Sequence, residues 1–253
     1  MSAGFFPEGG AAREWLIEHG LNLTILWDPA DGRRFLLGLG LTLALAVLAV
    51  ALSLAIGVAG AAVKGSRFAA GQKAINAYVE VFRNTPLLAQ MYFFFFGVGS
   101  LLPMVVNEHG EQVRLLGSFG WAVIVLGLHS GAFQIEALRG SIDAVPRATV
   151  EAAEALGLSR LQIFRQVIAP LALRHSLPAL SNSIAQTIKA TSVAFAIAVP
   201  ELTYACNRIW SDSFNVPVMI QVLLVTYLLL IGGVSAGMRA IERRLQLPGS
   251  VAA

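Results

Sequence analysis

The sequence predicts an all-α, multi-pass membrane protein with five transmembrane helices, the N-terminus outside, the C-terminus inside and a helical hairpin on the inner side. Three observations lead to this prediction. The 253 residues are 56% hydrophobic and only 13% charged, whereas an ordinary soluble domain has about 25% charged residues. The charged residues avoid five long apolar runs, and the Lys and Arg residues lie mostly on one expected side of the membrane.

The five apolar runs are each long enough to form a membrane span. An α-helix needs ~20 residues to cross ~30 Å of hydrocarbon. A soluble protein with this pattern would need five core helices without a polar face, so a membrane protein is the better interpretation. The second span is expected to begin near Asn76 and to pass through the phenylalanines at 93–96; the others are expected at about 35–62, 119–139, 176–200 and 216–240. The runs are Phe35–Val63, Asn84–Asn107, Leu115–Ile135, Ser176–Pro200 and Ser213–Met238.

The basic residues indicate the orientation of these spans. With the C-terminus inside, most Lys and Arg fall in inner segments, as the positive-inside rule prefers. Arg33 and Arg34, beside the first span, are the exception. The inner residues are Lys64, Arg67, Lys73, Arg139, Arg147, Arg160, Arg165, Arg174, Arg239, Arg243 and Arg244; the outer ones are Arg13, Arg33, Arg34, Arg114 and Arg208. This placement accounts for the positive charge without a nucleic-acid partner.

The chain is expected to form one membrane domain, at 35–247, between two terminal segments. Residues 1–34 contain tryptophans, which favour the headgroup region, so this segment is either an interfacial helix or a loosely ordered outer tail. Residues 101–118 and the segment around Arg208, Trp210 and Asp212 are expected to be outer loops. Residues 248–253 form a C-terminal tail.

The inner segment at about 141–175 has the pattern of two short helices joined at a glycine. Pro146 suits the first position of a helix, and Gly157 suits the left-handed residue that ends one. Ser159 and Gln162 have the spacing of a capping box for the second helix, and Pro170 is expected to stop it. A rigid hairpin between the third and fourth spans is able to transmit movement from a docked partner to both of them.

This hairpin resembles the EAA motif of the permeases of bacterial ABC transporters: Glu-Ala-Ala, three residues, Gly, nine residues, an apolar residue, and a closing Pro. The positions that match are Glu151, Ala152, Ala153, Gly157, Val167 and Pro170. Further tracts are similar to permeases for polar amino acids, and the similarity covers roughly 35–247. Those tracts are 82–90 (FRNTPLLAQ), 188–192 (IKATS) and 199–202 (VPEL). Ala190, Ala148 and His129 depart from the residues usual in that family.

The resemblance implies a non-catalytic subunit in the bacterial inner membrane. Its implied partners are two cytoplasmic ABC ATPase subunits, a second permease subunit (identical or related) and a periplasmic or tethered substrate-binding protein. ATP and Mg²⁺ would be bound by the ATPase, and no cofactor or metal is expected in this chain. The residues implied in coupling to the ATPase are Glu151, Ala152, Ala153, Glu154, Leu156, Gly157 and Pro170.

Polar residues inside the spans are candidates for the substrate pathway. A lysine in the middle of a span costs ~2.5–3.5 kcal/mol on insertion scales, so Lys189 should face a wet cavity or a carboxylate. It would either attract a substrate carboxylate or form an interhelical or gating contact. His129 is either a hydrogen-bonded packing residue or a substrate contact or proton relay. The other candidates for this pathway are Gln90, Gln134 and Gln186.

Two acid–base pairs with a spacing of three residues are expected to form along single helices. They are Glu80 with Arg83 and Glu136 with Arg139. Residues three apart lie on the same side of a helix, so both pairs are interpreted as positional.

The expected function is ATP-driven import of a polar amino acid. Lys189 and a tail at 242–249 similar to that of acidic amino acid permeases favour glutamate or aspartate, and a basic amino acid, glutamine or an opine is the alternative. A stand-alone secondary transporter would need more spans, repeats and broken helices with an ion site. An intramembrane enzyme is disfavoured because the chain has no HExxH, GxSxG or GxxxxGK[ST] motif.

Overall fold

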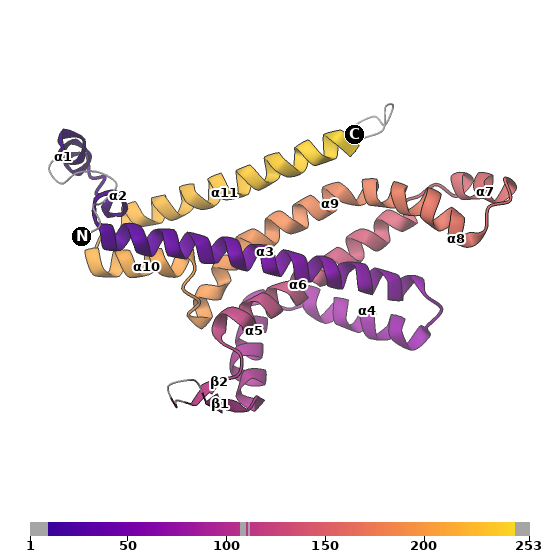
Figure 1. The fold of residues 1–253 in the computed structure, drawn as a ribbon, viewed down its shortest axis with the longest axis horizontal. Helices are drawn as coiled ribbons and strands as arrows, with labels where there is room; N and C mark the ends of the chain where they lie inside the picture. The colour runs from indigo at the N-terminus through magenta and orange to yellow at the C-terminus, as the bar shows by residue number, and fades with distance from the viewer. Residues whose placement is uncertain (1–9, 107–109, 111, 246–253) are drawn as a thin grey trace. The chain divides into compact units, whose positions relative to one another are not determined.

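The computed structural model describes residues 10–106, 110 and 112–245, and helices dominate this part of the chain (Figure 1). The all-α fold class is confirmed, with one short β-hairpin added to it. The chain divides into two compact units, each described by itself below: Met1–Leu48, Leu88–Val123 and Lys189–Ile231 form the first, and Ala49–Leu87, Ile124–Ile188 and Gly232–Ala253 the second. The division between the units cuts through four long helices, so each of these helices contributes residues to both units.

Three of the predicted spans are single long helices in the structure. They are α3 (Pro29–Gly65), α6 (Ser118–Asp143) and α11 (Val216–Leu245). Within the described residues, these three helices are long and apolar enough to cross a membrane, and helical residues 160–197 with 202–213 form a fourth, interrupted candidate. The total of five spans and the N-out orientation remain predictions.

Helix α3 begins six residues before the predicted span because local signals start it there. The Asp28 carboxylate accepts the backbone N–H of Ala30 at 2.8 Å, which satisfies one of the free donors of the first turn. Pro29 fits the first helical position. The lack of charge therefore marks only the middle of the helix, while the caps determine where it begins.

The described part of the segment before α3 is helical, and its end next to α3 is packed. It forms α1 (Ala11–Glu18) and α2 (Thr24–Trp27). Trp27 is buried, and Asn215 Nδ2 donates to the carbonyl of Asn22 at 2.5 Å. Residues 1–9 and the tail at 248–253 lie outside the described residues.

The second predicted span is wrong as a continuous helix. Helix α4 (Ala69–Asn84) ends at Thr85, which is extended, and α5 (Leu87–Tyr92) begins after Pro86. A proline lacks the N–H for the helix ladder and forces the preceding residue out of the helical region. The four phenylalanines follow in a π-helical turn, η1 (Phe93–Gly97), and a 3₁₀ turn, η2 (Val98–Leu101).

The first predicted outer loop contains a two-stranded antiparallel hairpin. Strand β1 (Met104–Val106) pairs with β2 (Gln112–Arg114), with Val105 opposite Val113. The guanidinium of Arg114 lies over the ring of Phe95, 5.2 Å from its centroid. The short alternation of apolar residues around a glycine turn is the signal that the loop interpretation missed.

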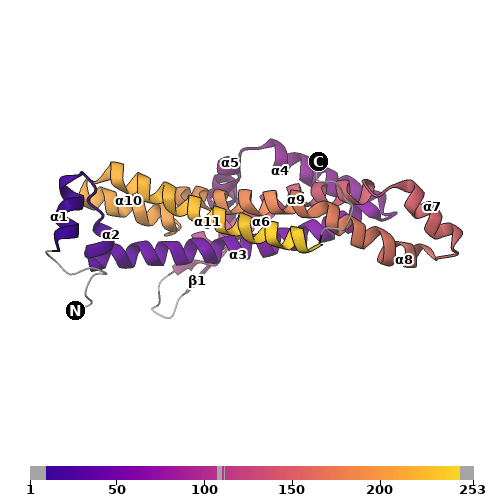
Figure 2. The ribbon, with the colours of Figure 1, turned by 90° about the horizontal axis from the view of Figure 1, so that it is seen from above.

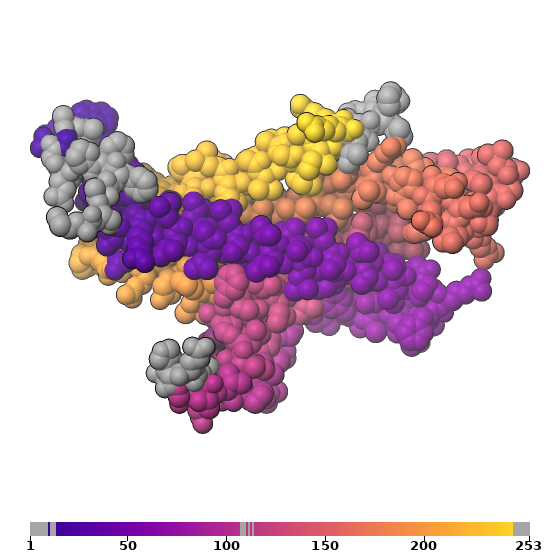
Figure 3. Space-filling model, viewed as in Figure 1, coloured from indigo at the N-terminus to yellow at the C-terminus, as the bar shows by residue number. Residues whose placement is uncertain are grey.

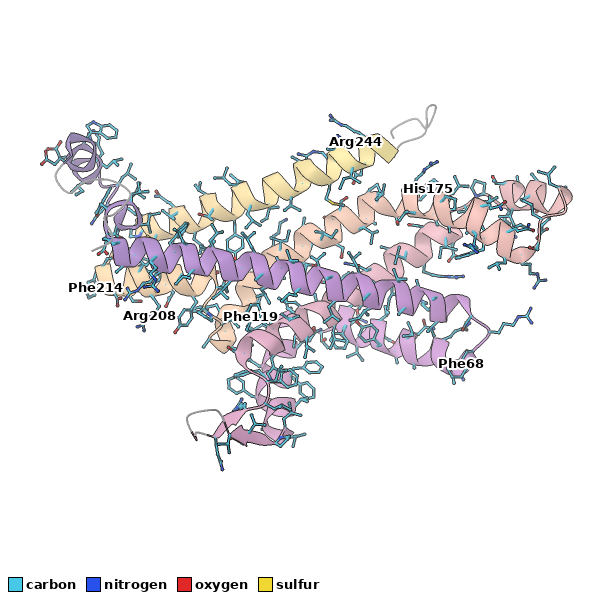
Figure 4. The ribbon with its side chains drawn as sticks, viewed as in Figure 1. Phe68, Phe119, His175, Arg208, Phe214 and Arg244 are labelled. Carbon is cyan, nitrogen blue, oxygen red and sulfur yellow. The ribbon has the colours of Figure 1, made fainter. Side chains whose placement is uncertain are left out.

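The outer loop predicted around Arg208 is wrong as a loop, because Leu202–Ser213 form the helix α10. It follows the 3₁₀ helix η4 (Thr191–Ile197) and a left-handed residue, Ala198 with φ +58°. Helix α10 ends at another left-handed residue, Phe214 (φ +53°), whose side chain is 90% exposed (Figure 4). The apolar residues of α10 recur at helical spacing, a pattern that predicts an amphipathic helix.

The core of the first unit forms around α10. Its fully buried residues are Leu202, Cys206, Ile209 and Met219. Leu39 of α3 is partly buried and packs against them. The N–H of Leu202 donates to Thr42 Oγ1 at 2.9 Å, so α3 satisfies a free donor at the start of α10.

The core of the second unit joins α3, α4 and α6. Val79, Ala132 and Ile135 are buried there and contact Ile56 on α3. The hydroxyl of Tyr78 on α4 donates to the carbonyl of Leu128 on α6. In the same unit, a hydrogen bond links α9 (Ala169–Ala190) to α11: Ser181 Oγ donates to Glu242 Oε1 at 2.6 Å.

Two glycines of α3 provide a matched test of packing in the first unit. A Cβ at Gly38 would lie 2.6 Å from Ala205 Cβ and 3.1 Å from the carbonyl oxygen of Glu201, whereas a Cβ at Gly40 would meet nothing within 4 Å. We expect Gly38→Ala to lower the free energy of unfolding by about 1–3 kcal/mol through overpacking. Gly40→Ala should raise it by about 0.5–1 kcal/mol through helix propensity.

Thermal unfolding of the purified chain in detergent measures both changes. Equal effects of the two substitutions would contradict the close approach of α3 and α10.

Candidate functional site

The first helix of the predicted hairpin is α7 (Arg147–Ala155), and Pro146 lies just before it at the cap. The sequence expectation was one residue off, since Pro146 was placed in the first turn. Among the predicted coupling residues, Ala153 is buried, so the side of α7 that carries Ala153 faces the protein interior. Figures 1 and 2 show α7 beside the following helix, α8 (Arg160–Ile163).

Gly157 ends α7 with the left-handed conformation that the sequence predicted, at φ +77°. The N–H of Gly157 donates to the carbonyl of Glu154 at 2.9 Å, and that of Leu158 donates to the carbonyl of Ala153 at 3.3 Å. This pair of bonds is a Schellman motif, which satisfies carbonyls that the helix end leaves free. A Cβ at Gly157 would meet no atom within 4 Å, so backbone conformation alone favours glycine here.

The second helix of the hairpin starts as predicted. Gln162 Oε1 accepts both the backbone N–H and the hydroxyl of Ser159, each at 2.8 Å. The Ser159 side chain in turn faces the backbone N–H of Gln162, so the two residues form a capping box. Two independent caps within three residues therefore fix the geometry of the turn at 157–159.

Pro170 does not stop the second helix, so that prediction is wrong. Helix α8 continues through a π-helical turn, η3 (Phe164–Ile168), directly into α9, and Pro170 lies in the first turn of α9. A π-helical turn inside a longer helix is rare, and here it comes directly before the turn that contains Pro170. The start of the fourth span, expected at about 176, is also wrong, because Pro178 lies inside α9 and the helix begins before it. The second helix of the hairpin is therefore continuous with α9.

The hairpin presents apolar side chains to its surroundings. Leu156 is 81% exposed and Leu161 is 65% exposed, and the described atoms of α7 and α8 lie at the surface in Figure 3. The predicted coupling residues Glu151, Ala152 and Glu154 are exposed as well. Exposed leucines on a turn with two caps suit a protein docking surface.

The candidate pathway residues divide between the two units. Gln90 and Lys189 belong to the first unit, and His129, Gln134 and Gln186 belong to the second. Within the second unit, Gln134 is fully buried and its Nε2 donates to Ser53 Oγ at 2.8 Å. A Cβ at Gly57 would lie 2.8 Å from Gln134 Cβ, so α3 and α6 approach closely at this polar contact.

His129 and Gln186 differ from Gln134 in their surroundings. His129 is partly buried, and its ring lies 5.3 Å from that of Phe133. Gln186 is exposed. Gln90, in the first unit, is 7% exposed. The roles of these residues in a substrate pathway remain predictions.

Lys189 lies in the last turn of α9, one residue before the α-helix gives way to η4. A cation at this end of a helix is favoured by the helix dipole. The side chain is exposed, and no carboxylate in the described part of the chain pairs with it. Its ammonium is therefore available to a group from outside these residues.

Both predicted ion pairs are wrong, because Arg83 and Arg139 form ion pairs with other carboxylates. Glu136 is the centre of an interhelical cluster: Lys64 Nζ on α3 lies 2.7 Å from Glu136 Oε1, and Arg83 Nη1 on α4 lies 3.6 Å from Oε2. Arg139 pairs instead with Asp143, one turn further on, at 3.1 Å. Tertiary proximity decides the partners of Glu136, whereas Arg139 stays within its own helix and pairs at a spacing of four residues instead of three.

The sequence analysis also missed the role of Glu201 in the first unit. Its side chain is fully buried and caps α10, accepting the N–H of Thr203 at 2.9 Å and of Tyr204 at 3.0 Å. The hydroxyl of Tyr227, on α11, donates to Glu201 Oε2 at 3.2 Å. An acidic residue directly before an amphipathic helix is the signal that would have found this cap.

Long apolar helices with an exposed hairpin, capped on both sides of its turn, are the features expected of the membrane subunit of a transporter that works with a soluble partner protein. In the described residues, no group of three His, Cys, Asp or Glu side chains is placed to hold a metal ion. Comparison with known proteins identifies the class. Residues 53–247 match the family described as "Binding-protein-dependent transport system inner membrane component", and the chain belongs to this family.

Known relatives are permeases of amino acid transport systems. The glutamine transport system permease protein GlnP of Escherichia coli (strain K12) is 35% identical over 170 residues, which cover 67% of this chain and 74% of that protein. The octopine transport system permease protein OccM of Rhizobium radiobacter is 34% identical over 154 residues, covering 60% of this chain and 62% of that protein. HisM of Salmonella typhimurium, a histidine/lysine/arginine/ornithine permease, is 32% identical over 172 residues, covering 66% and 71%.

Solved structures agree with this class. An amino acid ABC transporter crystallised with histidines matches with a TM-score of 0.75 and 28% identity, covering 84% of this chain and 94% of that chain. The inward-facing MetNI methionine ABC transporter matches with a TM-score of 0.59 at 16% identity, covering 94% and 100%, which shows the shared fold alone. The resemblance to amino acid ABC permeases is thus confirmed, and the chain is a permease subunit rather than an enzyme.

Proposed function

We propose that this protein is the membrane-spanning permease of an ATP-driven importer of polar amino acids in the bacterial cytoplasmic membrane. The observation that carries the proposal is the hairpin of α7 and α8, which is capped at both sides of Gly157 and continuous with α9. The relatives support the substrate class, since they are named for glutamine, octopine and basic amino acids.

The proposed coupling surface consists of the hairpin's exposed residues, seated on a cytoplasmic ABC ATPase. ATP-driven movement of the ATPase would pass through α8 into α9 without an intervening flexible joint, because α8, η3 and α9 follow one another as helix. On the other side, α7 connects to α6 through only 144–146. A binding protein would deliver the solute, and a second permease subunit, identical or related, would complete the pathway.

The solute is proposed only as a polar amino acid. The acidic preference expected from Lys189 and the tail at 242–249 gains no support from the relatives named above. The unpaired ammonium of Lys189 equally suits the α-carboxylate that every free amino acid carries.

Reconstitution tests the proposal directly. The permease, its ATPase and its binding protein, identified from the neighbouring reading frames, are placed in proteoliposomes with labelled glutamate, glutamine, arginine or octopine. We expect uptake of at least one of these solutes that requires ATP and the binding protein. Uptake by this chain alone, driven by an ion gradient without ATP, would instead establish a secondary transporter.

Leu156→Asp tests the coupling surface. The leucine is 81% exposed, so a charge there should leave the thermal unfolding of the chain unchanged. If Leu156 is buried against the ATPase, as apolar residues at the centre of interfaces usually are, the substitution should weaken association about tenfold or more. Co-purification of the tagged permease with the ATPase measures this, and Leu101→Asp, at an exposed leucine of the first unit, is the control.

A further inference from the structure

The second unit contains an apolar groove that the proposed transport function does not use. Its walls come from the end of α3, the end of α6 and the junction of η3 with α9, and its volume is about 690 Å³. Ligand pockets in proteins typically enclose about 300–1,000 Å³. All its lining residues belong to the second unit, so its shape depends on one compact body.

The walls of this groove are almost wholly apolar. They are formed by Val58, Ala61, Ala62, Gly65, Leu138, Ile142, Phe164, Ile168, Ala169, Ala172 and Leu173. Small residues on α3 and α9 create the hollow. Val58 is 61% exposed, Phe164 47% and Leu173 54%, so large apolar side chains border a space that no described residue fills.

One lining residue is charged, and its hydrogen-bonding capacity is mostly unused. Arg139 Nη2 pairs with Asp143 at 3.1 Å, and the Asp143 side chain is 58% exposed. Nη1 of Arg139 lies close to Gly65, 3.4 Å from the position a Cβ would take there. A guanidinium has five N–H donors, and the remaining donors of Arg139 have no acceptor among the described residues.

The charged groups on the elements that form the groove are predominantly basic. Lys64 is neutralised by Glu136 at 2.7 Å, and Asp143 neutralises part of Arg139. Arg165 and Arg174, which follow the lining residues Phe164 and Leu173 in the chain, are exposed and have no carboxylate partner in the described part of the chain. The groove therefore has an apolar interior with one guanidinium in its wall, and the elements that form it carry two further arginines without a carboxylate partner in the described part of the chain.

We propose that this groove binds an anionic phospholipid, with an acyl chain along its apolar walls and the phosphate at Arg139. Basic pockets between transmembrane helices are a known way of binding anionic headgroups. An arginine near a helix end also extends its guanidinium naturally toward the headgroup level. An apolar helix of a second permease would fill the walls equally well, but it would leave the free donors of Arg139 without acceptors.

The site has a consequence for the hairpin. Phe164 and Ile168 belong to η3, which continues the hairpin into α9. A lipid chain in the groove would contact η3 and both neighbouring helices at once. It would therefore stabilise one position of the hairpin relative to α3 and α6.

Lipid binding to the full-length chain tests the proposal. The purified protein in mild detergent is mixed with dioleoyl phosphatidylglycerol or, separately, with dioleoyl phosphatidylcholine, and native mass spectrometry counts the retained lipids. Wild type should retain phosphatidylglycerol about fivefold better than phosphatidylcholine. Arg139→Gln should bring the two lipids close to equal retention, and Ala62→Trp, which fills the groove at an exposed alanine, should remove the tightly bound lipid.

Arg208→Gln is the matched control. Arg208 is an exposed arginine that lines a different cavity, in the first unit, so its loss should not change the preference. If wild type shows no preference, or if Arg139→Gln retains it, the proposal is wrong. A change in self-association without a change in lipid retention, visible in the same spectra, would show that a second copy covers the groove.

These measurements need neither the ATPase nor the binding protein. Failure of the lipid proposal is therefore distinguishable from failure of the transport function. Thermal unfolding confirms that each variant is folded before its lipids are counted, and the two groove variants give independent readings.

Discussion

Replacing Gly157 with valine is expected to lower ATP-driven uptake by about tenfold or more while the chain stays folded and membrane-inserted. Gly157 has φ +77° at the end of α7. The left-handed conformation costs a residue with a Cβ roughly 1–2 kcal/mol, and branching at Cβ restricts the side chain further. Valine would therefore break the Schellman bonds to Ala153 and Glu154 and alter the angle between α7 and α8.

Two further variants separate this conformational effect from a loss of contact. Gly157→Asn should retain most activity, because asparagine is one of the few residues with a Cβ that adopt the left-handed region readily. Gly140→Ala, at a helical glycine in the same unit with nothing within 4 Å, should be close to wild type. Uptake and co-purification of the ATPase are measured for all three. Unimpaired, fully coupled transport by the valine variant would rule out the hairpin as the coupling element.

Glu201→Ala is expected to destabilise the protein by about 3 kcal/mol, the largest effect on folding predicted here. The substitution removes a helix cap, worth about 0.5–2 kcal/mol, and leaves buried donors unsatisfied at about 1–3 kcal/mol. The donors are the N–H groups of Thr203 and Tyr204 and the hydroxyl of Tyr227. Since Glu201 is fully buried, water cannot easily replace the lost acceptor.

Glu201→Gln and Asp212→Asn complete this test. The glutamine keeps one acceptor oxygen, so its destabilisation should be clearly smaller than that of alanine. Asp212 pairs with Arg34 at 2.8 Å, but both side chains are about half exposed, and exposed pairs contribute at most about 1 kcal/mol. A midpoint of thermal unfolding for Glu201→Ala as high as that of Asp212→Asn would contradict the role of Glu201 as a buried cap.

The two expected effects concern different units of the chain. Gly157 belongs to the second unit and Glu201 to the first. Loss of coupling with normal stability at Gly157, together with loss of stability at Glu201, would show that hairpin geometry and the core around α10 are separable properties. This is the pattern expected of a transporter subunit whose driving partner docks on a preformed surface.

Features that arise from neighbouring residues are predictable from the amino-acid sequence alone. Apolar runs predicted α3, α6 and α11, because a long helix without a polar side must be surrounded by hydrocarbon or protein. The caps at Gly157 and Ser159 were predicted correctly for a similar reason: a helix end is satisfied by residues within a few positions of it. The hairpin and the family followed from these local patterns.

The positions where helices break, and the polar groups that meet, depend on the folded arrangement of the chain. Pro86 breaks a predicted span, whereas Pro170 and Pro178 lie within a continuous helix, because neighbouring turns and packing determine whether a missing N–H is tolerated. Glu136 pairs with Lys64 and Arg83, 72 and 53 positions earlier in the chain, and Tyr227 reaches Glu201 from another helix. Such contacts depend on the distance between side chains after folding, which helical periodicity does not contain.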